Sequence, residues 1–175
     1  LTSGNYQADE HPVLRINAEL EDGRQEELFA FNDVLLERQT RQSVRFSVFL
    51  DGVLFNKFAG DGFVVATAAG STAYNLAAGG PAVHPELAAM VVTPLYPHQA
   101  VPFSSVRFSL AVPLDRSLVF VAEDLPKRGM RLVADGRPLD GASRVEVLDS
   151  ARRITLLRAE NMGFAEVLSR KIIGG

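Results

Sequence analysis

Residues 60–81 are the part of the sequence whose residue types and spacing suit chemistry. The segment reads Gly-Asp-Gly, then a short apolar run, then Gly-Ser-Thr-Ala-Tyr, and it ends on Gly-Gly-Pro. This order predicts a turn, a strand, a loop of small residues and a short helix. Small residues let a backbone approach a ligand closely, and Gly70-Ser71-Thr72 would offer N–H groups and hydroxyls that suit a phosphate or a ribose.

Two side chains of this segment could each contact a nucleotide. Tyr74 could stack on a base or donate its hydroxyl, and Asp61 could accept hydrogen bonds from a ribose diol. A purely structural interpretation also fits, in which the glycines serve geometry and Asp61 is a turn residue. From composition alone that structural interpretation is favoured. The segment is not a Walker loop, since no Gly-Lys-Ser/Thr follows, and it is not a G-x-G-x-x-G motif after a strand.

The elements that must position these residues are mostly short strands. Apolar and polar residues alternate through many segments, which places each apolar set on one face of a strand. The pairs Asp51-Gly52 and Asp135-Gly136 stand between such segments, as tight hairpin turns require. We expect strands at residues 14–20, 28–31, 34–37, 44–50, 53–58, 63–67, 106–112, 118–122, 130–134, 137–139, 145–148, 154–158 and 165–168.

Few helices are expected. Residues 71–78 predict a short helix with Ser71 or Thr72 as its N-cap, and residues 86–90 predict another helical turn. Strands at regular spacing with turn signals between them favour a β-sandwich or a related all-β architecture. With no repeat, low-complexity segment or linker in sight, one domain over residues 1–175 is the simplest interpretation.

The bulk composition narrows the class of protein. The net charge of −3 gives no sign of a nucleic-acid partner, and no apolar run is long enough to span a bilayer. The first ten residues are polar and mixed, so no signal peptide is expected, and the absence of cysteines fits a cytoplasmic protein without disulfides or Cys-zinc sites. The spacing of His11, His84 and His98 matches no zinc pattern, and we assign no metal ligand.

The motifs, in their order and spacing, resemble the signature of the NAD kinase family. Gly-Asp-Gly, Gly-Ser-Thr-Ala-Tyr and Ala-Gly-Gly-Pro form its long central part, and Asn32-Asp33 resembles the family's Asn-Glu/Asp pair. Residues 92–98 are similar to a segment ending in Thr-Pro-x-x-Pro-His, and Asp135-Gly136 also matches. Ala68-Ala69 and His11 depart from the pattern, since the family often has Pro-Thr or Pro-Ser and an arginine there. The resemblance covers nearly the whole chain and points to the C-terminal domain.

The resemblance implies a mainly β, β-sandwich-like C-terminal domain that binds NAD, spanning residues 1–175. Enzymes of the family transfer the γ-phosphate of ATP, or in some members of polyphosphate, to the 2′-hydroxyl of the adenosine ribose of NAD. Mg²⁺ would arrive with ATP, no tightly bound cofactor is implied, and a homodimer or homotetramer is expected. The family's proposed catalytic base lies in a Gly-Gly-Asp-Gly-Thr motif, which this sequence lacks. We therefore assign no catalytic residue to this sequence and expect the chain alone to be inactive.

The resemblance also suggests which residues bind the dinucleotide. Asn32 and Asp33 would contact adenine and its ribose, since an amide and a carboxylate can bond a base edge and a diol; the alternative is a β-bulge or Asx-turn. Asp61 would reach a dinucleotide bound mainly by a neighbouring subunit. A second group of binding residues consists of Thr72, Ala73 and Tyr74. The small Ala73 would act through its backbone, and the other two would act through their side chains.

Other interpretations remain open at this point. One is a catalytically inactive dinucleotide-binding or oligomerisation module, and another is a relative of the lipid kinases, such as diacylglycerol or sphingosine kinases. A plain β-sandwich without a nucleotide site is a further possibility. Gly-Ser-Thr-Ala-Tyr together with Asn32-Asp33 favours a dinucleotide over a lipid. We expect His11 and Arg152 to lie outside the site.

Overall fold

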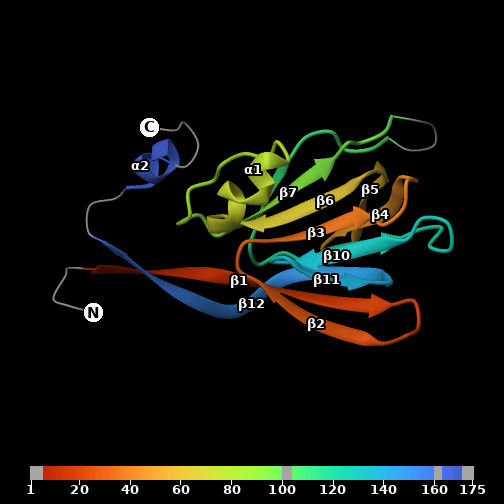
Figure 1. The fold of residues 1–175 in the computed structure, drawn as a ribbon, viewed down its shortest axis with the longest axis horizontal. Coiled ribbons are helices and arrows are strands. Elements are labelled where there is room, and N and C mark those ends of the chain that lie inside the picture. Colours follow the sequence, from red (N-terminus) through yellow and green to blue (C-terminus); the bar gives the residue numbers. More distant parts are fainter. Residues whose placement is uncertain (1–5, 100–103, 160–162, 171–175) are drawn as a thin grey trace.

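Two antiparallel sheets of six strands each make up the structure, a computed structural model that describes residues 6–99, 104–159 and 163–170 (Figure 1). The first sheet has the order β2 (Gln25–Ala30), β1 (Tyr6–Leu20), β12 (Ala142–Ala159), β9 (Leu118–Ala122), β4 (Val44–Leu50) and β5 (Val53–Gly60). The second has the order β11 (Arg137–Asp140), β10 (Met130–Ala134), β3 (Asp33–Arg38), β6 (Gly62–Thr67), β7 (Ala89–Leu95) and β8 (Leu110–Pro113). The prediction of a mainly β, sandwich-like domain is confirmed.

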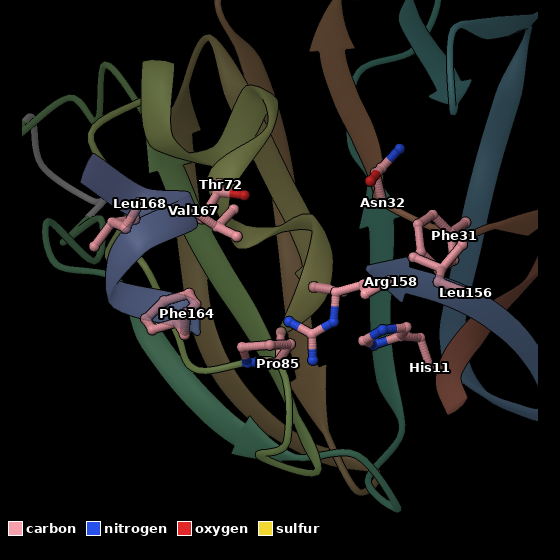
Figure 2. Close-up of a pocket in the computed structure, with 12 residues that line it drawn as sticks. His11, Phe31, Asn32, Thr72, Pro85, Leu156, Arg158, Phe164, Val167 and Leu168 are labelled. Atoms are coloured by element: carbon pink, nitrogen blue, oxygen red, sulfur yellow. The ribbon is translucent and has the colours of Figure 1, made fainter. Parts of the chain in front are cut away.

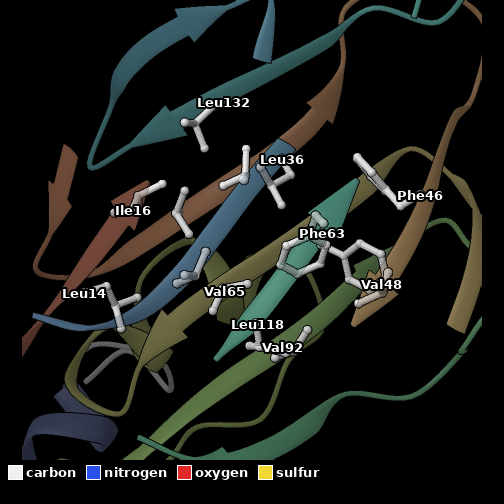
Figure 3. Packing of buried hydrophobic residues seen from close by; sticks show 14 of the residues in the cluster. Leu14, Ile16, Leu36, Phe46, Val48, Phe63, Val65, Val92, Leu118 and Leu132 are labelled. Carbon is white, nitrogen blue, oxygen red and sulfur yellow. The ribbon is translucent and has the colours of Figure 1, made fainter. Parts of the chain in front are cut away.

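The core lies between the two sheets and is built around a cluster of four phenylalanines. Phe46, Phe58 and Phe120 come from the first sheet and Phe63 from the second, with ring centroids 4.3–6.3 Å apart. Figure 3 shows Phe46 and Phe63 among the aliphatic side chains that surround them. Such tilted and offset ring pairs are favourable packing geometries. The cluster fixes the two sheets against each other and so holds the strand ends from which the site is built.

Strand β6 is buried along its whole length, unlike its neighbours. Strands such as β4 alternate buried and partly exposed residues, whereas all six residues of β6 are buried. One face packs on the core, and the other is covered by the segment that follows β6. That segment contains a 3-10 helix, η1 (Ala69–Thr72), and a single α-helical turn, α1 (Tyr74–Ala77). The signature segment is therefore attached to the most buried strand of the second sheet.

A long ribbon joins the first and last strands of the described chain. β1 and β12 pair from Tyr6↔Ala159 to Leu20↔Ala142, with a register shift between Pro12 and Leu14. The first half of this ribbon has no other strand beside it, because β2 pairs only with residues 14–19 of β1 and β9 only with residues 144–147 of β12. In Figure 1 this half extends away from the two sheets, towards the short helix α2 (Phe164–Leu168).

Three local predictions are wrong. Residues 165–168, expected as a strand, form part of α2. Their apolar pattern is too short to distinguish the period of a helix from that of a strand. Alanine, glutamate and leucine favour a helix. Residues 86–90, expected as a helical turn, form a tight turn closed by Leu87 N–H on the His84 carbonyl (3.0 Å), after which β7 begins at Ala89. The predicted cap residues do not cap α1, whose N-cap position is Ala73.

Other differences concern element bounds. Of the strand expected at residues 106–112, only residues 110–112 belong to a strand, β8. The two strands expected at 145–148 and 154–158 are parts of the single strand β12. No helix in the described part of the chain is long and apolar enough to cross a membrane.

Candidate dinucleotide-binding site

The turn that carries Asn32 is held in shape by one carboxylate from a distant hairpin. Asp135 accepts hydrogen bonds from three consecutive backbone N–H groups, those of Phe31 (2.6 Å), Asn32 (3.0 Å) and Asp33 (3.2 Å). It can do so because it sits in the β10–β11 turn with a positive φ of 44°, which aspartate tolerates better than most residues. Asp135-Gly136 was predicted to form a hairpin and is part of the resemblance, but its positioning role was not predicted.

The Asn32 turn also packs directly on the signature segment. Thr67, the last residue of β6, donates its backbone N–H to the Asn32 carbonyl (2.9 Å) and its hydroxyl to the Phe31 carbonyl (2.8 Å). The same hydroxyl accepts the N–H of Gly70 (2.9 Å). At Gly70 only a hydrogen fits, since a Cβ would lie 2.0 Å from the Asn32 carbonyl oxygen. Two motifs that are far apart in sequence thus form one rigid unit.

Two polar residues of the signature are structural. The buried Ser71 hydroxyl donates to the Ala68 carbonyl (2.7 Å) and accepts the N–H of Val83 (2.9 Å). The buried Asn75 amide donates to the Ser71 carbonyl (3.0 Å) and accepts from the hydroxyl of Thr93 (2.7 Å) on β7. Because these groups are used internally, they fix the loop and leave Thr72, Ala73 and Tyr74 facing outward.

Asp33 connects β3 to the start of α1. Partial burial raises the pKa of its carboxyl above the usual value, and repulsion from Asp135 raises the pKa further. A hydrogen bond from the backbone N–H of Tyr74 acts in the opposite direction. A carboxylate that is partly shielded from water and accepts few hydrogen bonds from the protein is well suited to accept hydrogen bonds from a ligand.

A hollow of about 250 Å³ opens beside the Asn32 turn (Figure 2). Its walls are mostly apolar and include Phe31, Leu156 and Phe164, which come from the chain before β3, from β12 and from α2. Its polar side chains are His11, Asn32, Thr72 and Arg158. An apolar hollow with a few convergent polar groups is the usual form of a site for a small organic ring. We call it the Asn32 hollow.

A second hollow, of about 480 Å³, is lined by residues of α1 and also by Asp61. Asp61 forms an ion pair with Arg38 (2.8 Å), and its backbone N–H donates to the Leu95 carbonyl (2.9 Å). Tyr96, which is 78% exposed, lies at its rim. We call it the Asp61 hollow.

The residues singled out from the sequence are therefore divided between two hollows. Asn32 and Thr72 line the first, and Asp61 and Tyr74 line the second. Asp33 and the exposed Ala73 line neither, although Asp33 is bonded to the backbone of Tyr74.

His11 and Arg158 were missed by sequence analysis, which expected His11 to lie outside the site. Both line the Asn32 hollow, and only the pairing of β1 with β12 brings them there. No pattern in the sequence signals this. Among the described residues, no group of three or more His, Cys, Asp or Glu side chains could hold a metal ion.

Comparison with known proteins agrees with this geometry. Residues 31–108, which include both motifs, match the model of the ATP-NAD kinase C-terminal domain family. The chain is 37% identical over 158 residues to the NAD kinase of Chlorobium luteolum, covering 88% of this chain and 53% of that protein. It is 38% identical over 147 residues to the NAD kinase of Caldicellulosiruptor saccharolyticus, covering 82% and 54%. The chain thus spans about half the length of these curated relatives.

Two solved structures share the fold. A crystal structure of yeast NADH kinase complexed with NADH superposes with a TM-score of 0.85 at 23% identity, covering 97% of this chain and 49% of that one. An NAD kinase from Archaeoglobus fulgidus in complex with ATP gives a TM-score of 0.72 at 24% identity, covering 88% and 56%. These two similarities show the fold, and the sequence matches lead to the conclusion that the chain belongs to the NAD kinase family and corresponds to its C-terminal domain.

Proposed function

We propose that the whole protein is an NAD kinase, which transfers the terminal phosphate of ATP or polyphosphate to the 2′-hydroxyl of the adenosine ribose of NAD. This chain, residues 1–175, would supply its dinucleotide-binding surface. The relatives at 37–38% identity are named NAD kinase, which favours a dinucleotide over a lipid as the phosphate acceptor. One structural neighbour was solved with NADH and the other with ATP.

The observation that carries the proposal is the fixed position of the Asn32–Asp33 turn beside an apolar hollow. Asp135, Thr67 and Gly70 hold the backbone of the turn that carries the Asn32 amide and the Asp33 carboxylate, so this backbone does not need to be ordered when a ligand binds. Preorganised groups bind more tightly because the entropy of ordering them is not lost on association.

Each candidate residue then has a role in binding. Asn32 and Thr72 would bond the adenine in the Asn32 hollow, and Asp33 would accept from the ribose diol beside it. Ala73 would act through its backbone, since its small side chain leaves room for a ring. Tyr74 would contact the remaining part of the dinucleotide in the second hollow.

The chain's contribution to phosphoryl transfer would be to bind and orient the acceptor. Catalysis of this reaction consists mainly of positioning and charge stabilisation. An oriented ribose presents its 2′-hydroxyl to the donor, whereas none of the described residues is assigned as the base. Mg²⁺ would travel with ATP, and in the described part of the chain no group of three or more His, Cys, Asp or Glu side chains could hold a metal ion.

We also propose a homodimer or homotetramer in which Asp61 reaches the dinucleotide held by a neighbouring subunit. The exposed Tyr96 at the rim of the Asp61 hollow supports this, as does the apolar edge strand β5, where Val53 is 70% exposed and Leu54 47%.

A cytoplasmic location fits the absence of cysteines.

Titration of NAD into the full-length protein tests the proposed site. Asp33→Ala and Tyr74→Ala should each weaken NAD binding about threefold to thirtyfold, because each removes a hydrogen bond or a ring contact worth about 0.5–1.5 kcal/mol or somewhat more. Arg152→Ala is the control, since its guanidinium lies 3.9 Å from the centre of the Phe29 ring and lines neither hollow. Unchanged affinity in both variants would exclude the site.

A further inference from the structure

Two buried polar atoms of residues that line the Asn32 hollow have no hydrogen-bond partner among the described residues. They are Nδ1 of His11, a residue only 7% exposed, and Nε of Arg158. Buried polar atoms of folded proteins are nearly always bonded, so an unbonded pair in one hollow needs an explanation. Both side chains line the hollow, and Figure 2 shows them on the same side of it, next to each other.

The ribbon of β1 and β12 presents these two residues on one face. In its register Gln7 lies opposite Arg158, Asp9 opposite Leu156 and His11 opposite Ile154. Opposite residues of an antiparallel pair point to the same side, and so does every second residue along each strand. His11, Leu156 and Arg158 therefore form part of one continuous surface that faces the hollow.

Contacts with neighbouring side chains hold both residues in place. A terminal nitrogen of Arg158 forms an ion pair with Asp9, which fixes the guanidinium and balances its charge. The His11 ring stands edge-on to Phe31, with centroids 6.0 Å apart and planes at 83°. Neither contact uses the two unpartnered atoms, so both side chains are held in place while these two atoms keep their capacity for a hydrogen bond.

The surroundings favour a ring over an anion. The charge of Arg158 is already balanced by Asp9, and much of the wall is apolar, with Phe31, Leu156 and Phe164. A phosphate would gain little from a neutralised guanidinium, whereas a flat heterocycle would fill the hollow and bond its polar edge to the two atoms.

We propose that His11 and Arg158 determine base specificity by bonding the polar edge of the adenine ring. The inference rests on the proposed function, which puts the adenosine of NAD in this hollow. Arg158 Nε–H can only donate, and Nδ1 of His11 accepts when the ring proton is on Nε2. Adenine carries an acceptor ring nitrogen beside its exocyclic amino donor, which complements this pair. Hypoxanthine exchanges the two positions, because its carbonyl only accepts and its neighbouring ring nitrogen carries a hydrogen, so in the same orientation neither His11 Nδ1 nor Arg158 Nε–H meets its complement.

The test compares NAD with nicotinamide hypoxanthine dinucleotide, titrated calorimetrically into the full-length protein. The wild type should prefer NAD. His11→Phe keeps a ring against Phe31 but has no acceptor, and should reduce that preference about threefold to tenfold. Arg158→Lys keeps a positive charge for Asp9 but lacks the Nε–H donor, and should weaken NAD binding by a similar factor. His84→Phe is the matched control, because His84 lines a neighbouring hollow and not this one, and its preference should stay at the wild-type value.

An unchanged preference for NAD in His11→Phe would overturn the inference. If His11→Phe fails to give a wild-type circular dichroism spectrum, Arg158→Lys decides, and undiminished NAD affinity in that variant overturns it. Asn32→Ala separates the base-edge inference from the proposed function. If Asn32→Ala weakens NAD binding while His11→Phe leaves the preference intact, only the base-edge inference fails. If Asn32→Ala also leaves NAD affinity unchanged, the adenosine does not occupy this hollow and both fail.

Discussion

The α-carbon of Gly70 faces the carbonyl oxygen of Asn32 so closely that a Cβ on residue 70 would lie 2.0 Å from that oxygen. Gly70→Ala must therefore displace the Asn32 turn or the signature loop. We expect it to lower the free energy of unfolding by about 1–3 kcal/mol, as overpacking in a rigid region does, and to weaken NAD binding. Urea denaturation followed by calorimetric titration measures both effects.

Gly163→Ala provides the control for that substitution. A Cβ there would meet no atom within 4 Å, and the residue has a negative φ of −69°. Its unfolding free energy should stay within about 0.5 kcal/mol of the wild type. Equal stability of the Gly70 and Gly163 variants would show that the close approach of the two motifs is not required.

The raised pKa of Asp33 predicts a pH-dependent stability. A carboxyl whose folded-state pKa lies above its unfolded value stabilises the fold at a pH below the unfolded pKa of about 3.9, and this contribution is lost as the pH rises through the folded pKa. Asp33→Asn removes the buried charge but keeps an oxygen for the Tyr74 N–H. At pH 7 the variant should be more stable than the wild type, and the difference should shrink as the pH falls towards 4.

Urea midpoints of both proteins between pH 4 and pH 7 check this expectation. The same variant should bind NAD more weakly, because an amide oxygen accepts from the ribose diol less strongly than a carboxylate. Asp115→Asn, at a carboxylate that is 78% exposed, is the control and should leave both measurements unchanged. A difference that grows towards low pH would contradict burial of the Asp33 carboxyl as the cause of the effect.

The edge strand β5 is where we expect the subunits of the proposed oligomer to associate. Val53, Leu54 and Phe55 are 40–70% exposed at the outer edge of the first sheet, and an exposed apolar edge strand readily pairs with another chain. Leu54→Lys should lower the molar mass of the full-length protein in light scattering towards that of a monomer. Leu87→Lys, at a residue 56% exposed but outside any strand, should not. An unaltered oligomer in the Leu54 variant would exclude this edge as the interface.

Local sequence signals were sufficient for much of the fold. Residues 44–50 alternate cleanly and form β4 with the predicted bounds. Asp51 and Gly52 both have positive φ, as the predicted tight hairpin requires, and so do Asp135 and Gly136. Where the pattern was short, as at residues 165–168, the same reasoning failed. Four residues are too few to distinguish the periodicity of a helix from that of a strand.

The site was harder to predict because its parts meet through long-range pairing. Asn32 and Gly70 could be named from their motifs, but their direct contact depends on β3 lying beside β6. His11 and Arg158 belong to opposite ends of the chain and share a hollow only because β1 and β12 pair in one particular register. A register of this kind depends on the whole sheet and cannot be derived from either strand alone.

The central place of β12 in the first sheet has a consequence for how the molecule forms. The strand order β2-β1-β12-β9-β4-β5 means that, until β12 is added, the hairpin of β1 and β2 is separate from the other three strands. The hairpin of β1 and β2 therefore joins the rest of its sheet only after β12 has been made, and loop closure over such a separation slows folding. In the meantime the inner edges of both parts lie open to other chains. Efficient production of this fold should accordingly depend on temperature and chain concentration during synthesis.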